Sequence, residues 1–279
     1  MIRIITDSTA DIGLAQAKEL DISIVPLKVI IDKKTYNDRV DLQPEQFYQL
    51  LQETDTLPTT SQPSPQEFLT FYEEAKAKGD SVVVMTLSSH ISGTYQSAMI
   101  AKDLSEYDNI YVIDSLNATQ GLRLLVEKAI QLRNDGKTAS EMFDILDIYK
   151  HRICIFALVD TLEYFYKGGR LSKASAIAGT MLKLKPIVGL KEGNLELISK
   201  ARGTQKATLK IIDIVKETGE IDLNEPVCIG YTGDNVGIDK FENTLREALG
   251  FNDVLYGFVG PVIGTHAGPG GRVIAFVKK

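Results

Sequence analysis

Short apolar runs rich in Ile and Val alternate with longer amphipathic stretches, and this alternation is the feature that most constrains the fold. Such runs predict buried strands, and apolar residues at helical spacing predict helices between them. In the first half the predicted strands are 2–6, 81–86 and 110–113, and the predicted helices are 12–20, 44–52, 65–78, a segment that ends near 134, and 138–150. Strands joined by crossover helices form a parallel sheet, so we expect an α/β unit.

Local signals refine this part of the pattern. The apolar stretch 22–31 contains Pro26 and precedes a polar turn, which predicts a strand that continues into an exposed hairpin. Ser64, Pro65 and Glu67 supply the N-cap, the first-turn proline and the N3 acid of a capping box. A helix should therefore begin at Pro65.

The second half predicts a mixed sheet with helices. The expected strands are 153–159, 227–231, 253–258 and an antiparallel 272–277, with a hairpin over 186–198; the expected helices are 173–182, 206–218 and 238–249. The fold class is therefore α/β with two lobes. Residues 1–152 form an N-terminal lobe with a mostly parallel sheet, flanking helices and a small hairpin near 27–40, and residues 153–279 form a C-terminal lobe with a mixed sheet and helices.

Charge and cysteine content narrow the class of protein. The chain has 31 basic and 37 acidic residues and a formal net charge of −6, which argues against general nucleic-acid binding, because such binding neutralises phosphates with Lys and Arg. Cys154 and Cys228 lie in apolar runs, so we expect buried reduced thiols. No run approaches the roughly twenty apolar residues that span a bilayer, and no signal-peptide pattern is found. We expect a cytoplasmic protein with no integral membrane segment.

Two clusters of hydroxyl side chains lie outside the predicted core. Residues 87–97 read Leu-Ser-Ser-His-Ile-Ser-Gly-Thr-Tyr-Gln-Ser and follow the strand at 81–86. The first backbone N–H groups of the next helix have no internal partner, so this turn can hold a small anionic head group, although Ser89 or Ser92 could simply cap the helix. Residues 57–63 carry the second cluster between two prolines, and we expect an extended loop there.

Two glycine-rich segments are also candidate sites. Lys167-Gly168-Gly169-Arg170 predicts a flexible basic turn that suits an anion, although adjacent glycines also commonly separate helices. Residues 260–271 hold five glycines, two prolines and His266, and we expect a loop that turns sharply or approaches a ligand closely. This loop lacks the Gly-Lys-Ser/Thr ending of a phosphate-binding loop, so it supports nucleotide binding only weakly.

The titratable residues offer few routes to catalysis. Ser92, His266 and Asp7 could supply a nucleophile, a base and an orienting acid, but no Gly-x-Ser-x-Gly turn surrounds the serine. The histidines lack the spacing of metal ligands, so we expect no metal site. Neutral donors remain, with Arg170 and His266 as the candidate cations. Such a set of groups suits the binding of a carboxylate.

Five motifs occur in order along the chain: Thr6-Asp7-Ser8-Thr9, Thr60-Ser61-Gln62-Pro63, Leu87-Ser88-Ser89-His90-Ile91-Ser92-Gly93-Thr94, Lys167-Gly168-Gly169-Arg170 and Gly264-Thr265-His266-Ala267-Gly268-Pro269-Gly270. Together they resemble the DegV family of bacterial fatty-acid-binding proteins, and the resemblance spans the whole chain. One departure is His90, where the family pattern has a smaller residue such as Gly.

The resemblance implies that a long-chain fatty acid is buried between two lobes, without a cofactor and without catalysis by this chain. Hydroxyls that match Thr60 and Ser92 would hold the carboxylate, with Arg170 and His266 behind them. The expected ligand-binding residues are Thr60, Ser61, Ser92, Gly93, Thr94, Arg170 and His266. The resemblance also implies presentation of the carboxyl group to a separate ATP-dependent fatty acid kinase, which makes an acyl phosphate for phospholipid synthesis. A serine-dependent acyl hydrolase or transferase using Ser92 and a nucleotide-binding regulator are the alternatives.

A local excess of positive charge predicts where such a kinase would dock. Residues 167–206 contain two acids, Glu192 and Glu196, among many Lys and Arg residues of an otherwise acidic chain. Charge runs are usually only solvated, but an excess of this kind can steer an acidic partner. We expect Lys167 and Arg202 to contact the kinase.

Overall fold

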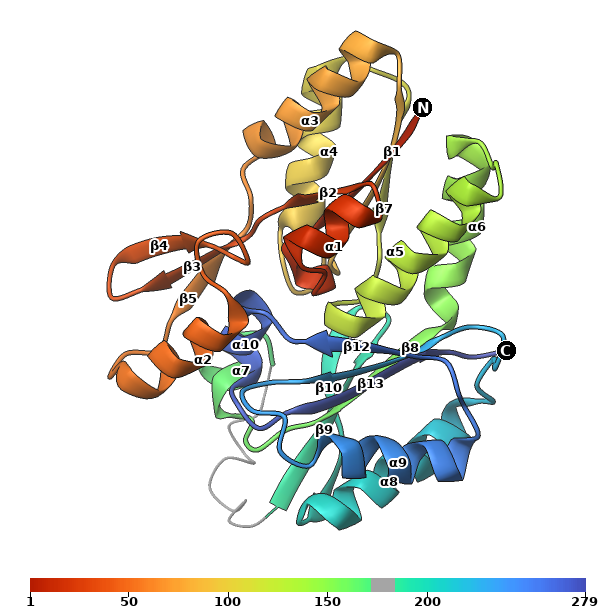
Figure 1. Ribbon diagram of the computed structural model, residues 1–279. Coiled ribbons are helices and arrows are strands. Elements are labelled where there is room, and N and C mark those ends of the chain that lie inside the picture. Colours follow the sequence, from red (N-terminus) through yellow and green to blue (C-terminus); the bar gives the residue numbers. More distant parts are fainter. Residues whose placement is uncertain (172–183) are drawn as a thin grey trace.

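The computed structural model describes residues 1–171 and 184–279 (Figure 1). The helix predicted at 173–182 lies outside the described residues. Two larger sheets and one small sheet carry the fold. No helix within the described ranges is long and apolar enough to cross a membrane.

A four-stranded parallel sheet of order β2–β1–β6–β7 organises the first half. Its strands are β1 (Ile2–Asp7), β2 (Ile22–Val25), β6 (Ser81–Thr86) and β7 (Ile110–Asp114), and its helices are α1 (Leu14–Glu19), α3 (Pro65–Lys78), α4 (Thr94–Ser105), α5 (Thr119–Asn134) and α6 (Ala139–Tyr149), with a short turn η1 (Ser8–Ala10). Because side chains alternate along a strand, Ile5 and Val84 pack against α3 and α4, whereas Ile4 and Met85 pack toward α5 and α6. The predicted parallel α/β unit is confirmed.

Pro26 changes the course of the chain between residues 22 and 31. The expected single strand is two strands, because β2 joins the parallel sheet while β3 (Lys28–Ile31) pairs antiparallel with β4 (Lys34–Asn37) and β5 (Thr59–Ser61). Helix α2 (Pro44–Glu53) lies between β4 and β5 in the chain. The expected loop at 57–63 is therefore partly a strand, and its pairing with β3 sets Thr60 opposite Val29.

A six-stranded mixed sheet of order β10–β9–β8–β13–β11–β12 organises the second half. Its elements are β8 (Ile153–Leu158), β9 (Leu184–Lys191), β10 (Asn194–Arg202), β11 (Val227–Tyr231), β12 (Val254–Phe258) and β13 (Arg272–Val277), with α7 (Glu163–Lys167), α8 (Thr204–Thr218), α9 (Ile238–Leu249) and the turn η2 (Lys150–Arg152). Ile274 and Phe276 pack toward α8 and α9, whereas Val273 and Ala275 share a core with α5. Strand β13 is antiparallel to both of its neighbours, as predicted.

The glycine-rich segment 260–271 is not simply a loop, because it contains helix α10 (Pro261–Ala267). Pro261 stands in the first turn, where its missing N–H needs no partner. A Cβ at Gly264 would lie 2.6 Å from Tyr48 Oη, so only glycine allows α10 to pack this closely on α2. His266, near the end of α10, is buried beside this contact.

Candidate ligand-binding site

A cavity of about 340 Å³ lies between the C-terminal sheet and the loops that follow the parallel strands. Leu27, Leu87 and Ala118 line it from beyond the ends of β2, β6 and β7, and Ile155 and Val188 line it from β8 and β9. In such sheets a ligand usually binds in the crevice outside the carboxyl ends of the parallel strands. The volume falls within the roughly 300–1,000 Å³ of small-ligand pockets.

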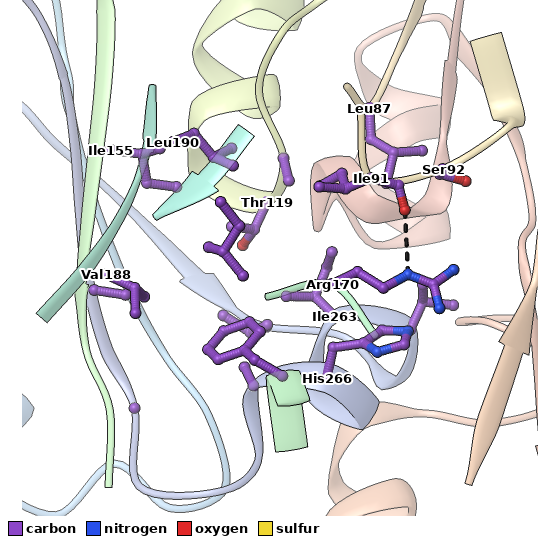
Figure 2. Close-up of a pocket in the computed structure, with 18 of the residues that line it drawn as sticks. Leu87, Ile91, Ser92, Thr119, Ile155, Arg170, Val188, Leu190, Ile263 and His266 are labelled. Atoms are coloured by element: carbon purple, nitrogen blue, oxygen red, sulfur yellow. Dashed lines mark hydrogen bonds between the residues drawn. The ribbon is translucent and has the colours of Figure 1, made fainter. Parts of the chain in front are cut away.

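Polar side chains gather toward one end of this mostly apolar cavity. Figure 2 shows Ser92, Arg170 and His266 on one side and Ile155 and Val188 on the other. Thr60 and Ser61 also line the cavity from β5. The structure thus brings together five of the seven ligand-binding residues predicted from the sequence, namely Thr60, Ser61, Ser92, Arg170 and His266.

His266 is paired with Thr60 and is neutral. Its Nε2 lies 2.8 Å from Thr60 Oγ1, and its Nδ1 is buried without a partner among the described residues. Burial, and to a lesser degree the charge of Arg170, lowers the pKa of His266 to about 4. Of the two candidate cations named from the sequence, Arg170 and His266, the lowered pKa of His266 leaves Arg170 as the charged one at neutral pH. Buried N–H groups without a partner are rarer than bare acceptors, so we assign the proton to Nε2, which leaves the Thr60 hydroxyl free to donate into the cavity.

Gly168 makes the position of the His266 ring possible. A Cβ at residue 168 would lie 2.2 Å from His266 Nδ1. The ring therefore packs against the backbone at the end of α7, where any larger residue would displace it.

Arg170 connects the basic motif at residues 167–170 to the hydroxyl-rich motif at residues 87–94. Its Nε donates to the carbonyl oxygen of Ile91 at 3.2 Å (dashed line in Figure 2), and its Nη1 donates to that of Gly168 at 2.8 Å. Its Nη2 donates to no residue in the described part of the chain, and no acid there forms an ion pair with it. Among the described residues the guanidinium therefore has one nitrogen without an acceptor, and it brings a positive charge to the polar end.

Gly93 and Thr94 stand behind the cavity wall rather than on it. Ser92 Oγ lies 2.9 Å from Thr94 Oγ1, so Thr94 orients the serine hydroxyl. A Cβ at Gly93 would lie 2.1 Å from Gln62 Oε1, so this glycine makes room for Gln62, which lines the cavity and donates to Ser97 Oγ at 3.0 Å. Sequence reasoning did not select Gln62, and its only signal was its place in the Thr60-Ser61-Gln62-Pro63 motif.

The three residues considered for serine catalysis do not form a relay. His266 is bonded to Thr60 and Ser92 to Thr94, while Asp7 accepts from the backbone N–H groups of Thr9 at 2.9 Å and Leu87 at 2.7 Å. Asp7 thus caps a turn. Within residues 1–171 and 184–279, no group of three or more His, Cys, Asp or Glu side chains could hold a metal ion.

A second pocket, of about 230 Å³, adjoins the polar end of the cavity. Thr60, Arg170 and His266 line both spaces, and Thr59 and Lys167 line only the second. We call this second space the outer pocket. Lys167 Nζ forms an ion pair with Glu163 at 2.5 Å, and both side chains are about half exposed, so the outer pocket reaches the surface.

The predicted docking residues lie on different elements. Arg202 is the last residue of β10; like Lys200 and Lys206, it is exposed and has no ion pair among the described residues. Lys167 ends α7. Lys173 and Lys183, which also belong to the basic segment, lie outside the described residues.

The chain is similar to known proteins over its whole length. A family model described as "Uncharacterised protein, DegV family" matches residues 1–279. A DegV domain-containing protein of Caldanaerobacter subterraneus subsp. tengcongensis is 39% identical over 278 residues, which are 100% of this chain and 99% of the relative. A fatty-acid-binding DegV family protein from Thermus thermophilus superposes with a TM-score of 0.90 at 31% identity, and a stearic-acid-binding protein from Eubacterium ventriosum with a TM-score of 0.90 at 28% identity; each match covers 100% of this chain and 99% of the other.

Proposed function

The chain belongs to the DegV family, and from that premise we propose that it binds a long-chain fatty acid in the cavity and presents the carboxylate to a separate ATP-dependent fatty acid kinase. The acyl phosphate formed there serves phospholipid synthesis. The observation that carries the proposal is a mostly apolar cavity in which Thr60, Ser92 and Arg170 lie toward one end. On this proposal the lobes are residues 1–152 and 153–279, and the ligand lies between them.

The apolar part of the cavity supplies most of the affinity. Each buried methylene contributes about 0.8 kcal/mol, so an acyl chain of roughly fourteen methylenes contributes about 11 kcal/mol before the costs of association. Tight binding therefore does not require a buried ion pair with the head group.

Thr60 and Ser92 are the proposed carboxylate donors. Thr60 is held by His266 and Ser92 by Thr94, so both hydroxyls are oriented before the ligand arrives. Arg170 Nη2 adds a positive charge that favours the ionised head group. Neutral donors leave one carboxylate oxygen free to act as a nucleophile, which a close ion pair to both oxygens would not.

The kinase supplies the chemistry, and the basic surface guides its approach. Arg202, Lys200 and Lys206 are exposed and have no ion pair among the described residues. The field of such a patch attracts an acidic partner. Because the kinase consumes ATP, the proposed place of action is the bacterial cytoplasm.

Mass spectrometry of an organic extract of the purified protein tests the proposed ligand. We expect one long-chain fatty acid per chain, and we expect the delipidated protein to bind added palmitate or oleate by calorimetry. No extracted fatty acid together with no binding of either added acid would refute the proposal. Hydrolysis of an activated acyl ester by the purified protein would favour the hydrolase alternative instead.

A further inference from the structure

The outer pocket is joined to the fatty-acid cavity by a shared wall. Thr60, Arg170 and His266 have surfaces in both spaces, and Lys167 is found only in the outer one. The two spaces differ in character, because the first is lined mainly by apolar side chains, whereas the second combines Leu57 and Pro58 with several hydroxyls and the two cations Lys167 and Arg170. A ligand whose carboxylate lies at the shared wall therefore has a charged space directly beyond it.

We propose that the outer pocket is a phosphoryl subsite, which holds the phosphate of the acyl phosphate after the kinase has acted. This inference rests on the proposed function. In the step concerned, a carboxylate oxygen attacks the γ-phosphorus of ATP, the new O–P bond forms, and the bond to the β-phosphate oxygen breaks with its electron pair leaving on ADP. No proton is consumed, and the head group changes from one negative charge to two.

Lys167 and Arg170, the two cations of the outer pocket, can bind the head group once it has gained this negative charge. The ammonium group of Lys167 has three N–H donors. Its ion pair with Glu163 involves a single carboxylate oxygen, so the other donors can serve a phosphate. Arg170 Nη2 has no acceptor among the described residues, since the hydrogen bonds that this side chain makes there use Nε and Nη1. Two charge-assisted donors can thus converge on the phosphate.

The outer pocket also has the necessary room. Its volume of about 230 Å³ is several times the roughly 30 Å³ that one water molecule occupies in the liquid. The phosphate can therefore remain attached to the acyl group without expelling the chain from the apolar cavity. The acyl phosphate would leave the kinase still bound to this protein.

Monohexadecyl phosphate is a stable probe, because it joins a sixteen-carbon chain to a phosphate and needs no kinase. We expect wild-type protein to bind it at least as tightly as palmitate. Lys167→Gln should weaken binding of the alkyl phosphate about tenfold, which is the loss expected for one charge-assisted hydrogen bond, and should change palmitate affinity less than about twofold. Glu163→Gln should act in the opposite direction, because it frees Lys167.

Lys137→Gln is the matched control, since the Lys137 side chain is also about half exposed and pairs with an acid four residues away, Glu141, at 3.7 Å, but lines neither space. It should change neither affinity. Equal effects of Lys167→Gln on both ligands, or normal palmitate binding without alkyl phosphate binding, would overturn the phosphoryl subsite alone. Failure of the wild-type protein to bind palmitate would instead overturn the proposed function.

Discussion

At the scale of single residues, the hydroxyls of Thr60 and Ser92 are held in place by hydrogen bonds to His266 and Thr94. Removing either hydroxyl leaves the carboxylate one donor short, so we expect Ser92→Ala and Thr60→Ala each to weaken palmitate binding by about 1–3 kcal/mol. Calorimetric titration of delipidated protein measures the change. Thr70→Ala is the control, because in the described part of the chain its hydroxyl bonds only to the Gln66 carbonyl oxygen on α3. Wild-type affinity in both site variants would exclude these roles.

Asp38 is a buried acid whose two carboxylate oxygens have no hydrogen-bond partner among the described residues. Burial raises its pKa to about 7, against the opposing charge of Arg39. The folded state thus holds this proton more tightly than the unfolded state, and the resulting stability is complete below about pH 4 and is lost as the pH rises through 7. We expect Asp38→Asn to stabilise the protein at pH 8 by up to about 4 kcal/mol and little near pH 4. Urea unfolding at several pH values measures this, and a difference that does not grow with pH would contradict it.

Residue types indicated the polar end of the cavity but not the state of each group. The two hydroxyl clusters and the basic turn with Arg170 could be selected as candidate sites from residue type, but Thr60 and Ser92 were assigned to the carboxylate by the resemblance to the DegV family. The neutral state of His266 could not be predicted, since it depends on burial that only tertiary packing creates.

At the scale of elements, the sequence predicted correctly those helices and strands that local interactions stabilise. The capping box of Ser64 and Glu67 forms as predicted and begins α3 at Pro65. Helix α10 was missed because Gly264 lowers helix propensity, and its packing on Tyr48 is a contact between distant segments. Strand β5 was missed for the same reason, because its partner β3 lies far away in the sequence.

The packing of α7 against α10 gives a prediction at this scale. Gly168 has a φ of −75°, so an alanine there meets no backbone strain, and its methyl group would lie 2.2 Å from His266 Nδ1. We expect Gly168→Ala to displace the ring, break its bond to Thr60 and weaken palmitate binding about tenfold. Gly13→Ala is the control, because its added methyl group would contact none of the described residues within 4 Å. If Gly168→Ala binds palmitate like wild type, the ring does not depend on this glycine.

At the scale of the whole molecule, an acidic chain carries three exposed basic residues close together in the sequence, Lys200, Arg202 and Lys206. Reversal of Arg202 to Glu should slow acyl-phosphate formation by the kinase at low salt, and the defect should shrink as salt screens the wild-type attraction. Palmitate affinity should not change, because Arg202 does not line the cavity. Lys240→Glu on α9 makes the same change in net charge at another exposed position and should leave turnover unaltered. Equal turnover of Arg202→Glu and wild type at low salt would remove Arg202 from the docking surface.

The hydrogen bond between Thr60 and His266 joins residues 206 positions apart. A nascent chain therefore has no complete head-group site until the ribosome has passed His266, so a fatty acid cannot template the early folding of the N-terminal half. It can stabilise only the finished fold, by mass action on the native state. If the proposed ligand becomes scarce, more chains unfold and are exposed to proteases, so the cellular amount of the protein would follow the supply of the fatty acid that it binds.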